Sequence, residues 1–292
     1  MSIVKSLSVG NGDMFYIKHD VDSFSIIDCC MSEEDKDSIV KEIESESESK
    51  NIRRFISTHP DDDHICGLDY LDSEMPIVNF YCVKNKATKP DVTTDFKKYC
   101  ELRDSGKPFY LYEKCSRKWL NDRNDEREGA GINILWPKTE NEHYKEALKK
   151  AEMGESPNNI SPIVEYSYAE GITMLWMGDL ESDFMDNIKG DLVLPSVVIL
   201  FAPHHGRGSG KVPKKWLDEM KPKIVIIGEA PSEDLNYYGD YNTITQNSAG
   251  DIVFECNTNK VHIYVSNEDY SVDFLEDEDM STFSNYIGTL NV

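Results

Sequence analysis

Apolar residues along this chain either alternate with polar ones or form short unbroken runs. Alternation is typical of a strand with one buried face, and a short apolar run between turn residues is typical of a fully buried strand. The first thirty residues show these patterns three times and predict strands at 3–9, 14–18 and 23–28. Gly10-Asn-Gly-Asp13 is a turn signal between the first two. The chain therefore begins as a β-sheet.

Strands and helices alternate after this start. The polar segment 33–49 carries Ile39, Val40 and Ile43 at helical spacing, and 67–71 favours a short helix. Residues 163–168 and 172–177 predict a hairpin across 169–171. Further strands are predicted at 52–56, 77–83, 132–136, 197–202, 224–228, 252–255 and 261–265. Such alternation predicts an α/β architecture with sheets inside and helices outside.

Two regions lack a clear pattern. Residues 84–130 are rich in charged residues with scattered aromatics, and predict helices and loops that cap one end of the sheets, with 121–131 an exposed loop. From residue 266 the chain turns acidic, which is typical of a solvated tail unless Phe274, Phe283 and Tyr286 pin it to the domain. We therefore expect one domain over 1–265, with 84–130 as an insertion or variable region, and an acidic C-terminal tail at 266–292.

Composition narrows the class of protein. Hydrophobic residues make up 39% of the 292 residues, which is enough for a packed core. No apolar run approaches the roughly 20 residues that span a bilayer, and the N-terminus lacks the pattern of a signal peptide. Seven scattered cysteines without a CxxC pair are typical of reduced, buried thiols. We expect a soluble, cytoplasmic protein that does not associate with membranes.

The net charge of −23, from 31 basic and 54 acidic residues, bears on the substrate. Proteins that bind long nucleic acid usually present a basic surface, and this overall field would repel a polyanion. A local basic groove or a bound metal would offset that repulsion at a site. The charge therefore favours a small or short substrate over a long polynucleotide.

The densest chemistry lies in Ser57-Thr-His-Pro-Asp-Asp-Asp-His-Ile-Cys-Gly67. Two histidines and three aspartates fall within six residues, directly after the strand predicted at 52–56. Carboxylates and neutral imidazoles are the ligands of hard and borderline divalent metals. So many carboxylates would repel one another unless solvent or a cation neutralised them. The segment predicts a metal site, and a metal-dependent hydrolase is the first hypothesis for function.

Two later segments repeat this arrangement. Gly178-Asp-Leu180 follows the strand predicted at 172–177, and Pro203-His-His-Gly206 follows the one at 197–202. Taken alone, Asp179 is an ordinary turn residue and the two histidines fit a surface position. All three segments nevertheless come directly after apolar strands. Strand ends that converge on one point are how layered folds build active sites, so we expect these segments to meet.

The order of these motifs resembles that of the metallo-β-lactamase-fold hydrolases, HxHxDH followed by a distal Asp and a distal His. The first motif here reads His59-Pro-Asp-Asp-Asp63-His64, with Asp61 where a second histidine is common. This variant resembles the branch that contains the soluble domain of the DNA-uptake competence protein ComEC. The resemblance covers about residues 3–265, and its other motifs lie at 9–13, 26–29, 158–161, 178–181, 203–206 with Ser209, 241–243 and 250–254.

The resemblance implies a four-layer αββα sandwich with two divalent ions, zinc or manganese, at one edge of the sheets. His59 and Asp61 would bind one ion, and Asp179 would bridge both. His205 would share the role of His204 or stabilise the leaving group. Asp63 would also orient the metal-bridging hydroxide that attacks the substrate. The implied metal ligands are His59, Asp61, Asp63, His64, Asp179 and His204, and the implied catalytic residues are Asp63 and His205.

The chain departs from the family pattern at several positions. Asn158 and Asn159 stand where many members have a third histidine for the first ion, and an amide oxygen is a weak ligand. The first ion is therefore expected to be loosely held or absent. Cys66 replaces a common glycine, and Cys29-Cys30 stands where glycine-like residues are common. A thiolate near the metal is one interpretation of Cys66, and a packed thiol is the favoured one.

Three functions fit these observations. The first is a phosphodiesterase or nuclease acting on a nucleotide or short nucleic acid, because the ComEC domain is thought to cut DNA. The second is hydrolysis of a thioester, lactone or similar carbonyl compound. The third is a non-catalytic binding or regulatory module, in which the acidic tail docks a basic protein partner or covers the site.

Overall fold

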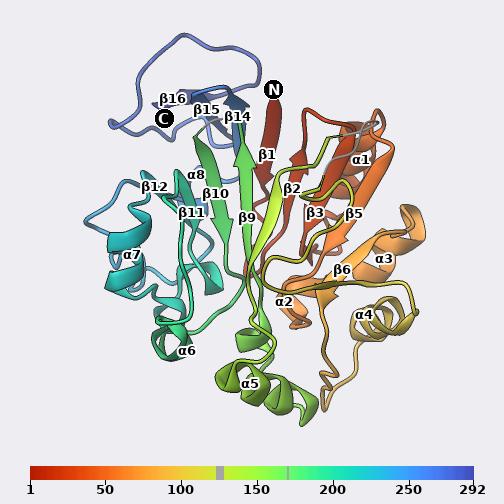
Figure 1. Cartoon of the computed structure of the whole chain (residues 1–292). Coiled ribbons are helices and arrows are strands. Elements are labelled where there is room, and N and C mark those ends of the chain that lie inside the picture. Colours follow the sequence, from red (N-terminus) through yellow and green to blue (C-terminus); the bar gives the residue numbers. More distant parts are fainter. Residues whose placement is uncertain (123–127, 170) are drawn as a thin grey trace.

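The computed structural model describes residues 1–122, 128–169 and 171–292, and these form two mixed β-sheets with eight α-helices (Figure 1). The larger sheet contains, in spatial order, β16 (Tyr286–Asn291), β15 (Lys260–Val265), β14 (Ile252–Asn257), β1 (Ser2–Ser6), β2 (Phe15–Lys18), β3 (Ser23–Ile27), β5 (Ile52–Ile56), β6 (Phe80–Val83) and β7 (Phe109–Leu111). The smaller sheet contains β13 (Thr243–Thr245), β12 (Ile224–Ile227), β11 (Ile199–Phe201), β10 (Ile172–Trp176), β9 (Ile163–Tyr168) and β8 (Ile132–Trp136). The predicted α/β class is confirmed.

Each sheet has an antiparallel part and a parallel part. Strands β14, β1, β2 and β3 pair antiparallel, whereas β3, β5, β6 and β7 pair parallel. In the smaller sheet β8 to β10 are antiparallel and β10 to β13 are parallel. Parallel strands need long crossovers. Helices within these crossovers are α1 (Lys36–Ser47), α2 (Asp62–Ile65), α3 (Leu68–Glu74), α4 (Thr94–Asp104), α6 (Ser182–Ile188) and α7 (Lys214–Met220).

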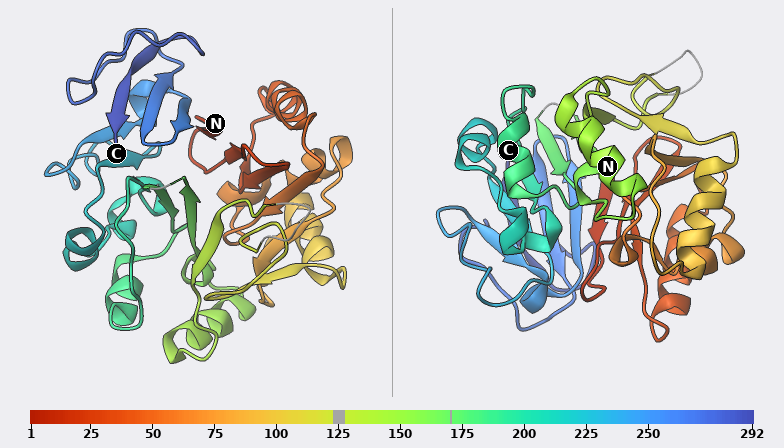
Figure 2. Two further views of the ribbon diagram at one scale, coloured as in Figure 1. Left: turned by 45° about the horizontal axis from the view of Figure 1, so that its top comes forward. Right: turned by 90° about the horizontal axis from the view of Figure 1, so that it is seen from below.

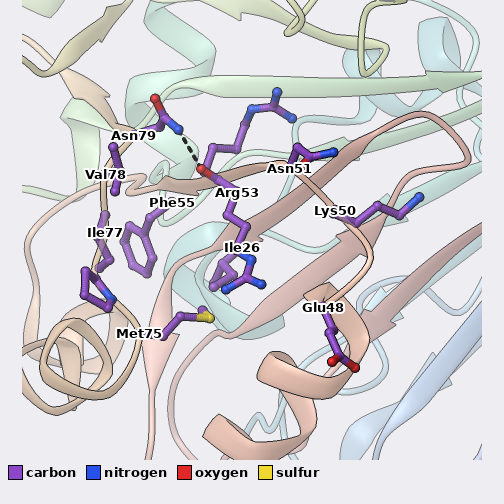
Figure 3. Close-up of a pocket in the computed structure, with 12 residues that line it drawn as sticks. Ile26, Glu48, Lys50, Asn51, Arg53, Phe55, Met75, Ile77, Val78 and Asn79 are labelled. Atoms are coloured by element: carbon purple, nitrogen blue, oxygen red, sulfur yellow. Dashed lines mark hydrogen bonds between the residues drawn. The ribbon is translucent and has the colours of Figure 1, made fainter.

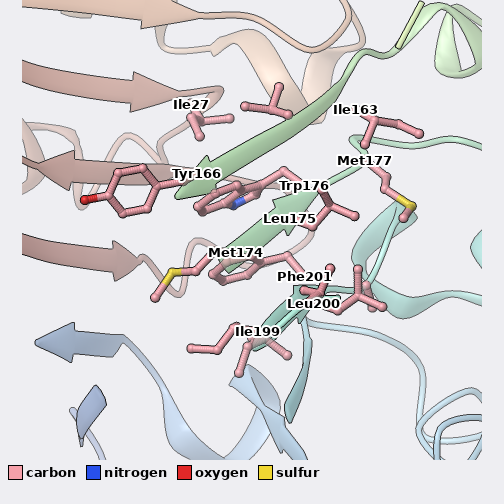
Figure 4. Close-up of a cluster of buried hydrophobic side chains, with 14 of the residues drawn as sticks. Ile27, Ile163, Tyr166, Met174, Leu175, Trp176, Met177, Ile199, Leu200 and Phe201 are labelled. Carbon is pink, nitrogen blue, oxygen red and sulfur yellow. The ribbon is translucent and has the colours of Figure 1, made fainter. Parts of the chain in front are cut away.

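The two sheets face each other across the larger hydrophobic core (Figure 4). Phe15 of the larger sheet packs edge-on against Trp176 and Phe201 of the smaller one, and those two rings stack with centroids 4.5 Å apart. A second cluster, with Phe24 and Phe55 at its centre, lies between the larger sheet and α1, α3 and α4. Figure 2 shows helices on the two outer sides with the strands between them. The alternating strand pattern therefore buries one face between the sheets and the other beneath helices.

The elements match the sequence prediction closely in the first half of the chain. The helix predicted at 33–49 is observed as α1, and the predicted hairpin is confirmed by antiparallel pairing of Ile172 with Tyr168, although residue 170 lies outside the described residues. The region 84–130 contains α4 and β7, and part of its predicted exposed loop, 123–127, is also outside the described residues. Within the described residues, no helix is both long and apolar enough to cross a bilayer.

The C-terminal segment is more ordered than a solvated tail. Residues 286–291 form β16, which pairs antiparallel with β15 at the edge of the larger sheet. The Thr289 backbone exchanges two hydrogen bonds with Glu276, and its hydroxyl lies 2.6 Å from His262 Nδ1. The sequence did not predict this strand, because its buried positions, 288–290, are too few to give an apolar pattern within an acidic segment. The proposed boundaries between domain, insertion and tail stay predictions.

A candidate metal centre at the edge of the sheets

The three motif segments meet at one edge of the paired sheets. Residues 57–64 follow β5, Gly178 and Asp179 follow β10, and 203–206 follow β11. Asp28 follows β3 at the same edge, since β3 and β5 run parallel, and Asp13 precedes the antiparallel β2. One ligand atom each from Asp13, His64, Asp179 and His205 lies within 4.8 Å of all the others. The structure therefore contains a buried His/Asp cluster that could hold a metal ion.

Asp179 lies at the centre of this cluster, with only 2% of its surface exposed. The Nε2 atoms of four histidines approach its carboxylate: His64 at 2.9 Å, His204 at 3.5 Å, His205 at 3.8 Å and His59 at 3.9 Å. A fifth group, Asp63, places its carboxylate 3.4 Å from Nε2 of His205 and 4.0 Å from that of His64. Imidazoles that converge on a carboxylate in this way form a suitable ligand set for a divalent metal ion.

The second ring nitrogen of each histidine is already in contact with another side chain. Asp28 accepts hydrogen bonds from both the backbone N–H and the hydroxyl of Thr58, so it acts as an acceptor toward His64 as well. A histidine whose Nδ1–H is held by an acceptor presents the lone pair of Nε2 to a metal. The contacts at Nδ1 are His64 with Asp28 at 2.9 Å, His205 with Asp13 at 3.0 Å, His204 with Ser209 at 2.8 Å, and His59 with Thr58 at 3.0 Å and Ser161 at 3.2 Å.

Several of the converging atoms are buried without a partner. His59 Nε2, His64 Nε2 and Asp179 Oδ1 make no hydrogen bond within the described structure. His64 Nε2 and Asp179 Oδ1 are 2.9 Å apart and form an ion pair while the ring is protonated, but with a proton on Nδ1 alone both atoms are acceptors that face each other without a donor. A buried polar atom left unsatisfied costs about 1–3 kcal/mol, so native structures rarely keep three together. A cation bound between them would satisfy all three, and the residues therefore fit a divalent metal.

Unusual backbone conformations orient the histidine pair and Asp179. His204, His205 and Gly206 are consecutive residues with positive φ of 54°, 56° and 88°. Such values are uncommon for residues other than glycine and occur where the surrounding structure enforces them. Gly178 also has a positive φ, and a Cβ there would lie 2.6 Å from Ser161 Oγ. These turns bring the histidine pair and Asp179 into close approach, which a less constrained loop would not maintain.

Burial and charge shift the pKa values of the cluster in opposite directions. Burial alone lowers the pKa of His205, but Asp13, Asp63 and Asp179 outweigh it and raise that pKa to about 10. Burial likewise opposes the shift at His64, whose pKa is raised well above its ordinary value by Asp179 and Asp28. In the metal-free protein these two imidazoles are therefore protonated at neutral pH.

The pKa values of His59, Asp179 and Asp63 are lowered. Burial lowers the pKa of His59 to about 3, assisted by the charge on His64. Burial raises the pKa of Asp179, but the His64, His59 and His205 imidazoles outweigh it and hold the value well below its usual range. Asp63 behaves similarly, because its hydrogen bond to His205 and the charge on His64 outweigh burial and lower its pKa to about 2. The metal-free centre is thus a network of buried ion pairs.

Metal binding should compete with the protons of this network. The raised pKa values of His64 and His205 contribute stability that is present in full below their unfolded value near 6.5 and is lost as pH rises through the folded values. An ion must displace those protons, so its affinity increases over the same range. We expect the Tm of the metal-free protein to fall between pH 7 and 9, while the rise in Tm on adding Zn²⁺ or Mn²⁺ grows. Thermal unfolding with and without chelator checks this, and a metal-induced rise that ignores pH would contradict it.

One predicted ligand does not join the cluster. Asp61 caps the N-terminus of α2 with extended backbone, and its carboxylate forms an ion pair with Lys89 at 2.7 Å. Asn159 is likewise engaged elsewhere, through hydrogen bonds with Glu181, whereas Asn158 is buried with its Oδ1 unpaired within the described structure. The other predicted site residues, His59, Asp63, His64, Asp179, His204 and His205, are brought together.

Sequence analysis assigned no role to the groups that hold the histidine rings. Asp13 belongs to the cluster by distance, but its carboxylate lies at Nδ1 of His205, so orientation of that ring is its more direct role. Asp28 has the same relation to His64. A signal for Asp28 was present, because it follows a buried strand in the same way as the motif residues do. Ser161, which contacts His59 and accepts from the Asp179 backbone, is the last residue of the motif at 158–161, but no role was assigned to it.

A large cavity lies elsewhere and lacks this chemistry (Figure 3). It has a volume of about 530 Å³ and is found where β5 and β6 begin, at the opposite edge of the sheet from the cluster. Its lining mixes apolar side chains such as Phe55 and Val78 with Lys50 and Arg53, and it includes none of the converging histidines. The candidate functional site is therefore defined by the His/Asp cluster and not by cavity size.

Comparison with models of known protein families gives no match to this chain, and comparison with curated proteins gives no significant match. The interpretation of the site therefore rests on the structure alone. The chain is an α/β protein whose two mixed sheets bring together a buried His/Asp cluster that could bind metal.

Proposed function

We propose that this protein is a metal-dependent hydrolase of the metallo-β-lactamase type, acting on phosphodiesters of nucleotides or short nucleic acids. The observation that supports it best is the convergence of four histidine Nε2 atoms on Asp179, each with its Nδ1 held by a neighbouring side chain. Two facing sheets with helices outside, and a site at the strand ends, are compatible with an αββα sandwich.

We further propose that the site holds two divalent ions. One would be held by His64, His204 and Asp63, the other by His59, with Asp179 between them. Asp61 would have to leave Lys89 to join His59 at its ion, so the ion at His59 is expected to bind more weakly than the other. Bound divalent ions lower the pKa of a coordinated water toward about 7 and neutralise developing negative charge.

The chain's own residues supply orientation and proton handling. Asp63 is the most exposed of the central carboxylates, with 24% of its side chain accessible, so it can reach an incoming water or substrate. Its low pKa keeps it ionised and able to accept a hydrogen bond from that water. His205, which contacts Asp13 through Nδ1 and Asp63 through Nε2, would return a proton to a leaving oxygen. The net charge of −23 favours a small anionic substrate over a long one.

The decisive experiment compares wild type with Asp63→Ala after the bound metals have been measured on purified protein. We expect metal in the wild type, cleavage of bis(p-nitrophenyl) phosphate, and a loss of at least about 100-fold in kcat for the variant, as for removal of one transition-state-stabilising group. Asp62→Ala is the matched control, because Asp62 lies next to Asp63 but its carboxylate binds Lys89 at the surface.

The same assay separates the alternatives. Equal turnover by wild type and Asp63→Ala would remove the proposal. Turnover of thioester or lactone substrates without cleavage of phosphodiesters would show that the site hydrolyses carbonyl compounds instead. Metal binding without turnover of any substrate would indicate a binding or regulatory module.

A further inference from the structure

Two half-buried cysteines lie side by side behind the metal centre. Cys30, in the short strand β4 (Cys29–Cys30), and Cys66, directly after α2, are partners in a parallel β-bridge. Neighbouring strands lie about 4.7–4.9 Å apart, which falls within the Cα separation of about 4.4–6.8 Å that a disulfide requires. Residues paired in this way also project their side chains from the same face of the ladder.

The side chains of the bridged pair are also close enough to influence each other. Interaction with the Cys66 thiol is the first cause, and burial the second, of the raised pKa of Cys30. Cys29, one residue earlier, is fully buried, and its thiol donates to the Cys66 carbonyl at 3.3 Å. The alternation along β4 thus directs Cys30, and not Cys29, toward the Cys66 side chain.

The surroundings confine the Cys30 sulfur to this position. A Cβ added to Gly12 would lie 2.4 Å from Cys30 Sγ and 2.6 Å from the Asp63 carbonyl oxygen, so the sulfur packs against the Gly12 backbone beside Asp63. On the other side the Cys66 thiol donates to the Met31 carbonyl at 3.5 Å. Because the backbones are already paired, joining the sulfurs needs side-chain rotation and little backbone movement.

We propose that Cys30 and Cys66 are a site of reversible oxidation, forming a disulfide with small-molecule disulfides such as oxidised glutathione. One cysteine thiolate attacks the oxidant and releases one molecule of thiol, leaving a mixed disulfide. The second cysteine then attacks the protein sulfur of that bond and releases the second thiol. The protein loses two hydrogen atoms and the oxidant is reduced to two thiols, so electrons and atoms balance.

The bond would link β4 to the end of α2, the helix that carries Asp63 and His64. It would therefore form beside the metal cluster without using any residue that we assign to metal binding. The inference does not depend on hydrolase activity; it depends only on the reaction of these two thiols.

The test treats the reduced full-length protein with oxidised glutathione, blocks free thiols with N-ethylmaleimide and maps peptides without reduction. We expect a single cross-link between the peptides containing residues 30 and 66, and a fall in the thiol count of the unfolded protein from seven to five. Dithiothreitol should restore all seven. Peptide mapping does not by itself separate Cys29 from Cys30, so Cys29→Ser and Cys30→Ser are compared.

The variants make each outcome decisive. Cys30→Ser and Cys66→Ser should lose the cross-link, whereas Cys29→Ser and Cys100→Ser should keep it; Cys100 is another half-buried cysteine, on α4. Retention of the cross-link in Cys30→Ser would overturn the assignment. So would the appearance in wild type of glutathionylated peptides alone, or of no oxidation at all. Tryptophan fluorescence and Tm confirm that each variant is folded before it is scored.

Discussion

Replacing Asp179 by alanine is expected to weaken binding of Zn²⁺ or Mn²⁺ by more than about 100-fold, measured by isothermal titration calorimetry. Residues that only orient a metal ligand already contribute 10- to 100-fold in affinity, and Asp179 is the carboxylate on which four Nε2 atoms converge. Asp179→Asn should have a similar effect, because the amide keeps the shape but removes the charge.

The two Asp179 variants also report on the metal-free fold. Both substitutions remove the carboxylate that His64 and His205 share, so the pKa values of these two histidines should fall. The Tm of the metal-free protein should then lose part of its pH dependence. Asp183→Ala serves as the control, since it removes an acidic residue from the first turn of the neighbouring α6. Unchanged metal affinity in Asp179→Ala would place the ion outside this cluster.

Asp28→Ala should lower the free energy of unfolding by about 3–5 kcal/mol, as expected for removal of one partner from a buried, hydrogen-bonded pair. Asp28 is 1% exposed and accepts from His64 Nδ1, the Thr58 backbone N–H and the Thr58 hydroxyl. Alanine leaves these donors without an acceptor in a dry environment. Urea unfolding of the metal-free protein measures the loss, and a change below about 0.5 kcal/mol, typical of surface positions, would contradict it.

Asp28→Asn separates stability from metal binding. Its carbonyl oxygen can still accept from the Thr58 backbone N–H, so the loss of stability should be smaller than in the alanine variant. Its amide nitrogen, however, would donate to Nδ1 of His64, which moves the ring proton to Nε2, the atom that approaches Asp179 at 2.9 Å. We expect metal affinity to fall about 10- to 100-fold, the usual effect of changing an orienting partner. A variant as stable as wild type and with equal affinity would remove the orienting role.

Sequence periodicity was most informative where burial is regular. Strands β1, β2, β3 and β5 bury nearly every residue and were placed within a few positions of their observed bounds, as was α1. The same rule located the segments of the candidate metal site, because each follows an apolar strand that ends at one edge of its sheet. β16 was not placed, since its buried stretch is short and lies in an acidic segment.

Candidate ligands could be selected from local motifs because residue type and strand position are both properties of the sequence. His59, Asp63, His64, Asp179 and the histidine pair were chosen in this way, and the structure places them around one point. Asp61 was chosen by the same motif, yet its carboxylate turns outward. The difference arises from Lys89, whose ammonium group reaches it from another loop, and from its position as the cap of α2.

By itself, therefore, the sequence determined the α/β class, most strands and the residue types available for a metal. Tertiary structure alone decided which ring nitrogen of each histidine is free. Ser161 reaches His59 across 102 residues, and Asp13 reaches His205 across 192. It also paired Cys30 with Cys66 across a β-bridge. The physical reason is that hydrophobic periodicity reports burial over a few residues, whereas hydrogen-bond partners depend on which distant segments the packed sheets bring to the same edge.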